Sequence, residues 1–540
     1  MAAKPLSIKG AECRSSGCAS KAVELTSGDL PSVLESRLRS ERSLLIRWQE
    51  SAEGIVVPAS RDEGPNGPRE GIKGAMSRRR DSTTDRRQKN QYCLAFSEES
   101  RGAAPTASAG GTESELAKRK AESPATEQWM EEVCERENCK QALRRVKANK
   151  GSPGIDGMTV EQLPGHLQEH WPAIREQLLS GTYRPQPVRR VEIPKPDGGV
   201  RKLGIPTVLD RFIQQAVMQV LQRSWDGTFS EHSYGFRPKR SAHQAVEQAQ
   251  QYQAEGYRWV VDLDLEKFFD RVNHDRLLAK IAERISDKRL LTLLRAFLQA
   301  GVMENGLVSP SEEGTPQGGP LSPVLSNIVL DELDQELERR GHRFTRYADD
   351  CNIYVRSRRA GERVMRSVTR LLTTKLKLRV NSEKSAVARP WERKFLGFSF
   401  TNHKPPKRRL APKTVARFKE RVRELTRRTR GISLARMVHE LAEYLRGWIG
   451  YFGRCETPEV LDKLEKWFRH RLRSMVWKQW KRGTTRYREL RKRGIAAQEA
   501  AQTAGSSDGP WHLANSPAVK VALSNAYFAS LGLPELTVRG

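Results

Sequence analysis

The amino-acid sequence predicts an α+β core followed by a basic, all-helical region. Between about residue 129 and residue 400, strand-like segments alternate with segments that repeat apolar residues every three or four positions. Beyond residue 411 only the helical repeat remains. The 540 residues include 95 Lys and Arg against 65 Asp and Glu, a formal net charge of +30. Such an excess favours nucleic acid as the partner, with an anionic membrane surface as the competitor.

The first 125 residues differ in composition from the rest. Their aromatic residues are only Trp48, Tyr92 and Phe96, and residues 101–128 are rich in Gly, Ala, Ser and Thr. Such a segment buries too little apolar surface to offset the entropy lost on ordering. We therefore predict that residues 1–125 are mostly disordered and that order begins near Trp129.

The elements of the α+β core can be predicted in chain order. One helix should span residues 129–149, and residues 150–163 should form a turn-rich loop followed by a short helix. Between residues 188 and 206, two strands should be joined by a turn at Asp197-Gly198-Gly199. Further helices are predicted near 207–224, 241–255, 274–301 and 318–340, with a strand at 258–265 and a hairpin at 343–355. Mixed strands and helices of this kind are typical of the α+β class.

Three basic helical segments are predicted after residue 411, at 415–431, 437–453 and 459–482. In the third segment one apolar stripe is formed by Leu461, Leu464, Phe468, Leu472 and Met475. Lying off that stripe, and predicted to form a cationic outer face, are Lys463, Lys466, Arg469, Arg473 and Lys481. Trp448, Tyr451 and Trp477 are candidates for stacking on unpaired bases, but a place in the helix core is the more frequent use of such residues.

Two acidic motifs occur in strand-like surroundings. Asp262 and Asp264 alternate with apolar residues, so both should point to one face of a strand, while Asp349 and Asp350 form the hairpin tip with Ala348. Clustered carboxylates repel each other but suit hard divalent cations. Two Mg²⁺ ions about 4 Å apart can activate a hydroxyl and stabilise a leaving pyrophosphate. Either motif alone could be a simple turn former. Together, in so basic a chain, they favour metal-assisted phosphoryl transfer.

The two motifs resemble boxes of a known enzyme class. YADD, residues 347–350, resembles the catalytic box of reverse transcriptases, and DLEKFFD, residues 264–270, resembles the box that carries their other metal-binding aspartate. With GSPGIDGMTVEQL, GTPQGGPLSPVLSN and FLGFSF, the chain from about Trp129 onward resembles the proteins encoded by bacterial group II introns. The resemblance implies a right-hand polymerase with fingers and an antiparallel palm sheet, followed by an all-helical thumb and maturase region.

The resemblance also implies domain boundaries and site residues. The expected domains are an N-terminal extension at 1–125, fingers and palm at 126–400, thumb and maturase helices at 401–485, and a basic segment at 486–540 that is a candidate for DNA binding. The implied catalytic residues are Asp264, Asp349, Asp350 and Lys384, and the three aspartates would hold two Mg²⁺ ions. The implied dNTP-binding residues are Lys195, Arg201, Phe269 and Gln317, with Phe269 placed to exclude a 2′-hydroxyl.

The implied function is an RNA-directed DNA polymerase that is also a maturase. It would act in a ribonucleoprotein with its intron RNA, on target DNA and with dNTPs, in the bacterial cytoplasm and at the nucleoid. The sequence leaves the oligomeric state open. No apolar run reaches the roughly 20 residues of a membrane-spanning helix, so no membrane partner is expected. The alternatives are a reverse transcriptase recruited to defence or diversification, and a splicing-only maturase.

Two departures from the family pattern are notable. Many such proteins end in a zinc-dependent endonuclease, which needs clustered Cys and His. Here Cys455 is the last cysteine and only His470 and His512 follow it, so we expect no zinc site and no endonuclease. The first 125 residues have no counterpart in the pattern, which suggests translated upstream intron sequence, with Met76 and Met130 as alternative starts.

Overall fold

The computed structural model describes residues 128–194, 200–304, 307–309, 313–315 and 318–537. The predicted N-terminal extension, Lys195, the Asp197-Gly198-Gly199 turn and Gln317 lie outside these residues. For Arg201 the backbone alone is described.

The helix predicted from Trp129 is divided into two. Helix α2 spans Trp129–Val133 and α3 spans Arg136–Asn149. The Glu135 carboxylate accepts hydrogen bonds from the backbone N–H groups of Glu137 and Asn138, and this N-cap starts a new helix. The prediction of one continuous helix was therefore wrong. Residues 151–162 form a loop with turns, so the short helix predicted at the end of 150–163 was wrong. Helix α4 at Leu163–Leu179 begins where that segment ends and was not predicted.

The first sheet has four strands in the order β2-β1-β4-β5. Its members are β1 at Val188–Pro194, β2 at Val200–Ile205, β4 at Val302–Glu304 and β5 at Leu307–Ser309. The predicted strand pair is confirmed, because β1 and β2 are antiparallel with Val191 opposite Leu203. Strand β1 is parallel to β4, which was not predicted.

Most helices of the α+β core match the prediction. The helices are α5 at Val208–Trp225, α6 at Ala242–Ala254, α7 at His274–Ala282, α8 at Lys288–Gln299 and α9 at Ser322–Arg339. The single helix predicted over 274–301 is in fact α7 and α8. The Asp287 carboxylate accepts from the backbone N–H groups of Arg289 and Leu290 and so begins α8.

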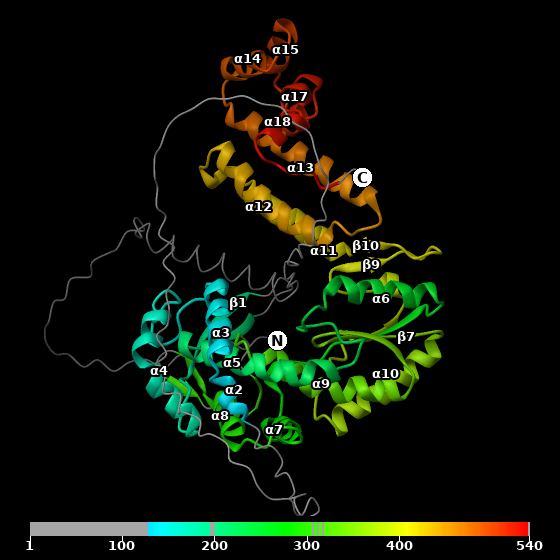
Figure 1. The fold of residues 1–540 in the computed structure, drawn as a ribbon. Helices are drawn as coiled ribbons and strands as arrows, with labels where there is room; N and C mark the ends of the chain where they lie inside the picture. Colours follow the sequence, from blue (N-terminus) through cyan, green and yellow to red (C-terminus); the bar gives the residue numbers. More distant parts are fainter. Residues whose placement is uncertain (1–127, 195–199, 305–306, 310–312, 316–317, 538–540) are drawn as a thin grey trace, which may run out of the picture. The chain divides into compact units, whose positions relative to one another are not determined.

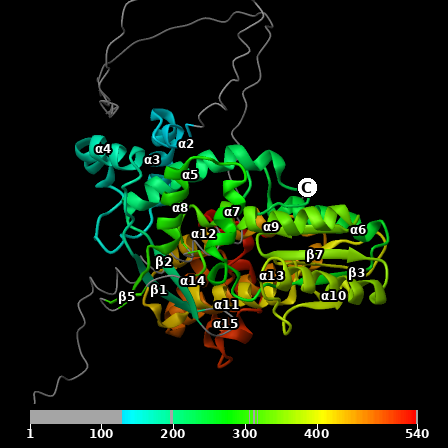
Figure 2. The same cartoon turned by 90° about the horizontal axis from the view of Figure 1, so that it is seen from below.

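The second sheet is antiparallel throughout, as predicted, with the order β6-β7-β3-β8. Its strands are β3 at Trp259–Leu263, β6 at Arg343–Tyr347, β7 at Asp350–Val355 and β8 at Ala386–Ala388. We call it the palm sheet. Helix α6 packs against β6 and β7, and α10 at Arg358–Thr374, which was not predicted, packs against β3, β7 and β8. Figure 2 shows α6 and α10 on opposite faces of this sheet.

The region beyond residue 411 is helical, as predicted. A small antiparallel pair, β9 at Phe398–Phe400 and β10 at Arg408–Leu410, precedes it. The helices, coloured yellow to red in Figure 1, are α11 at Pro412–Leu425, α12 at Leu434–Phe452, α13 at Pro458–Gln479, α14 at Gly483–Lys492, α15 at Ala497–Gly505, α16 at Pro510–Leu513, α17 at Pro517–Ala522 and α18 at Asn525–Ser530. One-turn 3₁₀ helices lie at Asp226–Thr228, Phe268–Asp270, Pro390–Glu392 and Arg428–Arg430.

The apolar stripe of α13 is buried, as are Trp448 and Trp477, which are therefore core residues. One predicted outer-face residue of this helix was wrong. Arg469 is 1% exposed and forms an ion pair with Glu465 at 2.9 Å. The Glu465 carboxylate also accepts from the backbone N–H of Leu536 at 3.1 Å, because the C-terminal segment covers this side of α13. Lys463 and Lys466 are exposed, as predicted.

Candidate active site of the palm sheet

Strand pairing brings the two acidic motifs to the same end of the palm sheet. Strands β3 and β7 are antiparallel, with Asp262 opposite Asn352 and Leu263 opposite Cys351. Asp264 therefore follows at the level of Asp350, the first residue of β7. The two motifs lie far apart in the chain, so this proximity results from the sheet register.

The acidic hairpin has a tight tip. Tyr347 pairs with Asp350, which leaves Ala348 and Asp349 as the connecting residues. Ala348 has a φ of 56°, a left-handed conformation that is unfavourable for a residue with a Cβ. Its carbonyl oxygen accepts a hydrogen bond from Arg346 Nη1 at 3.0 Å. On its other side, a Cβ placed on Gly235 would lie 2.3 Å from the Ala348 nitrogen, so only glycine fits there.

Arg346 connects this tip to α9. Its side chain is completely buried and donates to both carboxylate oxygens of Asp334, at 2.5 to 3.0 Å. It also donates to Asn327 Oδ1 at 3.0 Å and to Ser233 Oγ at 2.7 Å. The sequence prediction missed Arg346. The available signal was a charged residue at an inward position of an apolar strand, because a buried guanidinium needs a set of acceptors.

Asp262 lies near the other acidic residues but has a cationic partner of its own. Arg393 donates to the Asp262 carboxylate at 2.6 Å. Burial raises the pKa of Asp262, and the attraction of Arg393 opposes that rise. This close ion pair leaves Asp262 less available for a metal than Asp264, whose cationic neighbour Lys384 is 3.7 Å away.

Lys384 lies beside Asp264. Its Nζ is 3.7 Å from Asp264 Oδ2, and the lysine side chain is 67% exposed. The segment that carries Lys384 is attached to the end of β3. The backbone N–H of Asn381 donates to the Asp264 carbonyl at 2.8 Å, and the backbone N–H of Asp264 donates to Ser385 Oγ at 3.0 Å. An exposed ion pair is weak, so Lys384 is free to leave Asp264 when a stronger partner arrives.

Asp350 experiences the mutual repulsion of the acidic residues. Restricted access to water, and after it the carboxylates of Asp349, Asp262 and Asp264, raise the pKa of Asp350 to about 8. Asp350 begins β7 with an exposed side chain, and the neighbouring carboxylates repel its charged form. A bound cation would remove this repulsion, so the donor set has the chemistry of a divalent-cation site. In the described part of the chain, no three acidic, His or Cys side chains are already close enough together to hold a metal ion.

Phe269 lies just beyond Asp264, next to the loop that leads to Gln317. Its ring is half-buried and meets the Phe268 ring edge-on, with 5.3 Å between centroids. Its carbonyl accepts from the Thr315 N–H at 2.6 Å. A Cβ on Gly314 would lie 2.7 Å from that same oxygen, so close approach of the two segments needs this glycine. The structure thus fixes the Phe269 backbone against the Gly314-Thr315 segment and leaves part of its ring accessible.

Comparison with known protein families identifies the family of this chain. Residues 193–400 match the family model for reverse transcriptase (RNA-dependent DNA polymerase), and residues 415–494 match the group II intron maturase-specific domain. The chain belongs to the group II intron-encoded reverse transcriptases. Its polymerase domain is an RNA-directed DNA polymerase, and a maturase domain follows it. The reverse transcriptase family generally uses divalent metal ions.

Two curated relatives support this assignment. Protein YkfC of Escherichia coli is 35% identical over 305 residues, which cover 49% of this chain and 79% of YkfC. Group II intron-encoded protein LtrA of Lactococcus lactis is 40% identical over 195 residues, which cover 36% of this chain and 32% of LtrA. The chain thus spans about a third of LtrA. A chain in a solved Cas6-RT-Cas1–Cas2 complex is 23% identical to this chain, with a TM-score of 0.30. The match covers 46% of this chain and 42% of the chain in that complex.

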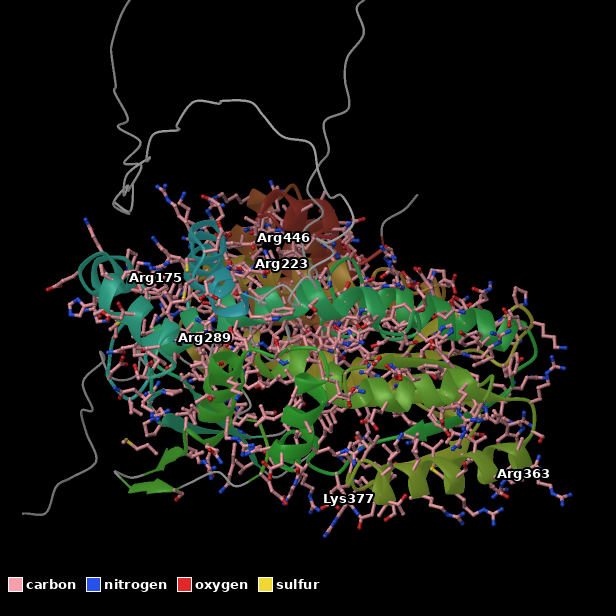
Figure 3. The ribbon with its side chains drawn as sticks, turned by 60° about the horizontal axis from the view of Figure 1, so that its bottom comes forward. Arg175, Arg223, Arg289, Arg363, Lys377 and Arg446 are labelled. Atoms are coloured by element: carbon pink, nitrogen blue, oxygen red, sulfur yellow. The ribbon has the colours of Figure 1, made fainter. Side chains whose placement is uncertain are left out.

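The reverse transcriptase carries positive charge far beyond its palm. Figure 3 labels cationic side chains on α4 (Arg175), α5 (Arg223), α10 (Arg363) and α12 (Arg446). Family members of this kind bind nucleic acid in complexes. Among the described helices, none is both long enough and apolar enough to cross a membrane.

Proposed function

We propose that this protein copies its intron RNA into DNA at the insertion site and also helps that RNA to splice. It would do so as a ribonucleoprotein with intron RNA, target DNA and dNTPs, in the bacterial cytoplasm and at the nucleoid. The observation that carries the proposal is the meeting of Asp264, Asp349 and Asp350 at one end of the palm sheet, with Lys384 beside them.

Each site residue has a role that its position supports. Asp264, Asp349 and Asp350 would hold two Mg²⁺ ions. When bound, the ions supply activation of the primer hydroxyl and neutralisation of the leaving pyrophosphate. Lys384 would leave Asp264 and donate to the triphosphate, since an ammonium forms charge-assisted bonds to phosphate.

The remaining nucleotide contacts extend this proposal to the other predicted residues. Phe269 would pack against the sugar and exclude a 2′-hydroxyl, so that the product is DNA. Lys195, Arg201 and Gln317 would contact the incoming dNTP and its template base. Lys195 and Gln317 lie outside the described residues, and for Arg201 only the backbone is described. The roles of these three residues therefore rest on the family resemblance.

The other domains have proposed roles as well. Residues 126–400 would form the polymerase, and the helices of 401–485 would bind intron RNA. The segment 486–540 is the candidate for target-DNA binding. The match to a maturase-specific domain favours a role in the splicing and mobility of an intron over a role in defence or diversification.

Primer extension on an RNA template with Mg²⁺ and labelled dNTPs tests the proposal. Asp349→Ala should lower the rate of primer extension by orders of magnitude. RNA binding should persist, because it depends on the basic surface. Asp275→Ala, which removes an exposed carboxylate on α7, is the matched control and should extend normally. Tight RNA binding without extension by the unmodified protein would instead identify a splicing-only maturase.

A further inference from the structure

A hollow of about 410 Å³ lies on the palm sheet, away from the carboxylates. It lies between the beginning of β6, the end of β7 and the first turns of α10, and its wall includes Tyr257. Asp350 begins β7 and Val355 ends it, so five residue steps of about 3.4 Å put the hollow roughly 17 Å from the catalytic tip. A primer end held by the carboxylates therefore does not occupy it.

The wall of this hollow is cationic. Arg343, Arg356 and Arg363 line it together with His342, and no lining residue is acidic. No ion pair joins any of the three guanidiniums to a carboxylate of the described residues. Other surface arginines of this chain do have such a partner, for example Arg358 with Glu362 at 2.9 Å on the same helix. Three guanidiniums around one concavity, none of them held by a carboxylate, are suited to a phosphate-bearing ligand, because guanidinium donates in pairs to phosphate oxygens.

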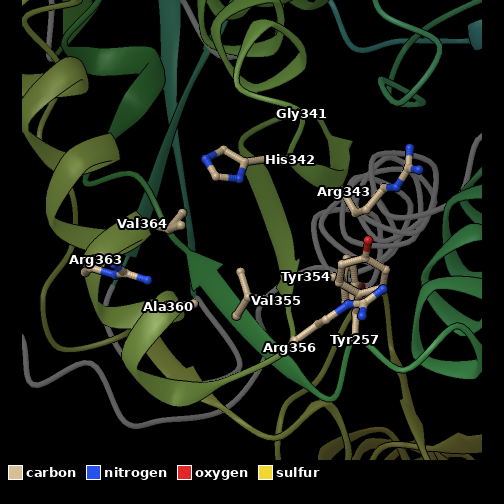
Figure 4. A pocket seen from close by; sticks show the side chains of 10 residues that line it. All are labelled: Tyr257, Gly341, His342, Arg343, Tyr354, Val355, Arg356, Ala360, Arg363 and Val364. Atoms are coloured by element: carbon tan, nitrogen blue, oxygen red, sulfur yellow. The ribbon is translucent and has the colours of Figure 1, made fainter.

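The hollow also has an aromatic and apolar side. The Arg356 guanidinium lies 5.2 Å from the centroid of the Tyr257 ring. In Figure 4, Arg343 and Arg356 lie beside the tyrosine rings, whereas Arg363 lies across the hollow on α10. Ala360 and Val364 complete the wall. The half-buried Tyr257 ring next to a guanidinium is a surface on which an unpaired base can stack. The volume of the hollow falls in the range of small-ligand sites, about 300–1,000 Å³.

We infer that this hollow binds one unpaired, phosphorylated nucleotide of an RNA strand. The half-buried Tyr257 ring and the Arg356 plane receive the base, and Arg343 and Arg363 receive the flanking phosphates, while Tyr354, which is 2% exposed, only forms part of the wall. This inference rests on the proposed function in that it takes RNA to be the partner. It adds a contact outside the polymerase site, which would anchor the RNA on the palm while its end is being copied or spliced.

Photocross-linking tests the inference with the full chain. The probe is a single-stranded RNA of about twelve nucleotides that contains 4-thiouridine, and cross-linked peptides are mapped by mass spectrometry. We expect a cross-link to the segment around Tyr257 or Tyr354. Arg356→Ala with Arg363→Ala should lower its yield about tenfold, since each lost charge-assisted bond weakens binding. Primer extension on a short template should be retained.

Two further variants test whether the cross-link requires this hollow or only positive charge on the surface of α10. Arg366→Ala with Arg370→Ala removes the same charge from exposed positions of α10 that do not line the hollow, and should leave the cross-link intact. Ala360→Phe fills the hollow while keeping every arginine, and should suppress the cross-link as strongly as the arginine pair does. Equal loss in both arginine pairs would overturn the inference.

The remaining outcomes are also decisive. Cross-links confined to other segments would overturn the inference and leave the proposed function standing. RNA that neither binds nor cross-links anywhere would refute both. Loss of the cross-link when UMP is added at the concentration of the RNA would show a site for free nucleotides, which overturns the assignment to a strand.

Discussion

Arg346 gives the sharpest test of how the fold holds its catalytic tip. In Arg346→Met the buried Asp334 carboxylate loses the guanidinium that neutralises it, and the carbonyl of Ala348 loses its donor. Removing one partner of a buried ion pair costs about 3–5 kcal/mol, because the other charge stays buried and uncompensated. At roughly 2–4 °C per kcal/mol for a domain of this size, the Tm should fall by roughly 6–20 °C.

A second substitution separates stability from positioning. Asp334→Leu added to Arg346→Met removes the stranded charge, so most of the lost Tm should return. Primer extension should stay low, because nothing then holds the Ala348 carbonyl and the left-handed tip is free to move. The assays are thermal unfolding by circular dichroism and single-nucleotide incorporation, with the exposed Arg339→Met on α9 as control. A Tm change below about 2 °C in Arg346→Met, or full activity in the double variant, would refute the reasoning.

Three further predictions concern the site itself. Phe269→Ala should admit ribonucleotides in competition assays, while Phe269→Tyr keeps discrimination; equal discrimination in all three proteins would remove the sugar-gate role. If Lys384 assists the leaving group, Lys384→Ala should slow nucleotide incorporation about a hundredfold or more. Lys377→Ala, at an exposed position, is the control. An unchanged rate in Lys384→Ala would contradict that assistance. Because the folded pKa of Asp350 is raised to about 8 from 3.8, the folded state holds the extra proton and stability falls as pH rises through that window. In EDTA, the Tm of Asp350→Asn should therefore exceed that of the unmodified protein at about pH 9 and equal it at about pH 4. Equal Tm values at about pH 9 would argue against the repulsion.

Local signals in the sequence account for many elements of the fold, but helices α4 and α10 and the pairing of β1 with β4 were not predicted. Alternation and three- or four-residue periodicity predict the β1–β2 pair, the strand that contains Asp262 and ends just before Asp264, the hairpin of Asp349 and Asp350, and the basic helices after residue 411. Helix boundaries were less accurate. Glu135 and Asp287 each begin a new helix through a side-chain cap, and such a cap competes with the apolar periodicity that runs past it.

The sequence by itself determined which residue types the site contains. Asp is depleted from strands and clustered carboxylates repel each other, so their presence in strand-like segments indicates a bound cation, and their spacing resembles one enzyme class. Only the tertiary structure decided how those residues are held and neutralised. Asp262 is neutralised by Arg393, Arg346 ties the tip to α9, and Arg469 is buried against Glu465 although its helical position predicts an outer face. These partners lie 131, 12 and 4 residues apart. Their burial depends on which segments cover them, and segment packing is set by contacts across the whole chain and not by any local pattern.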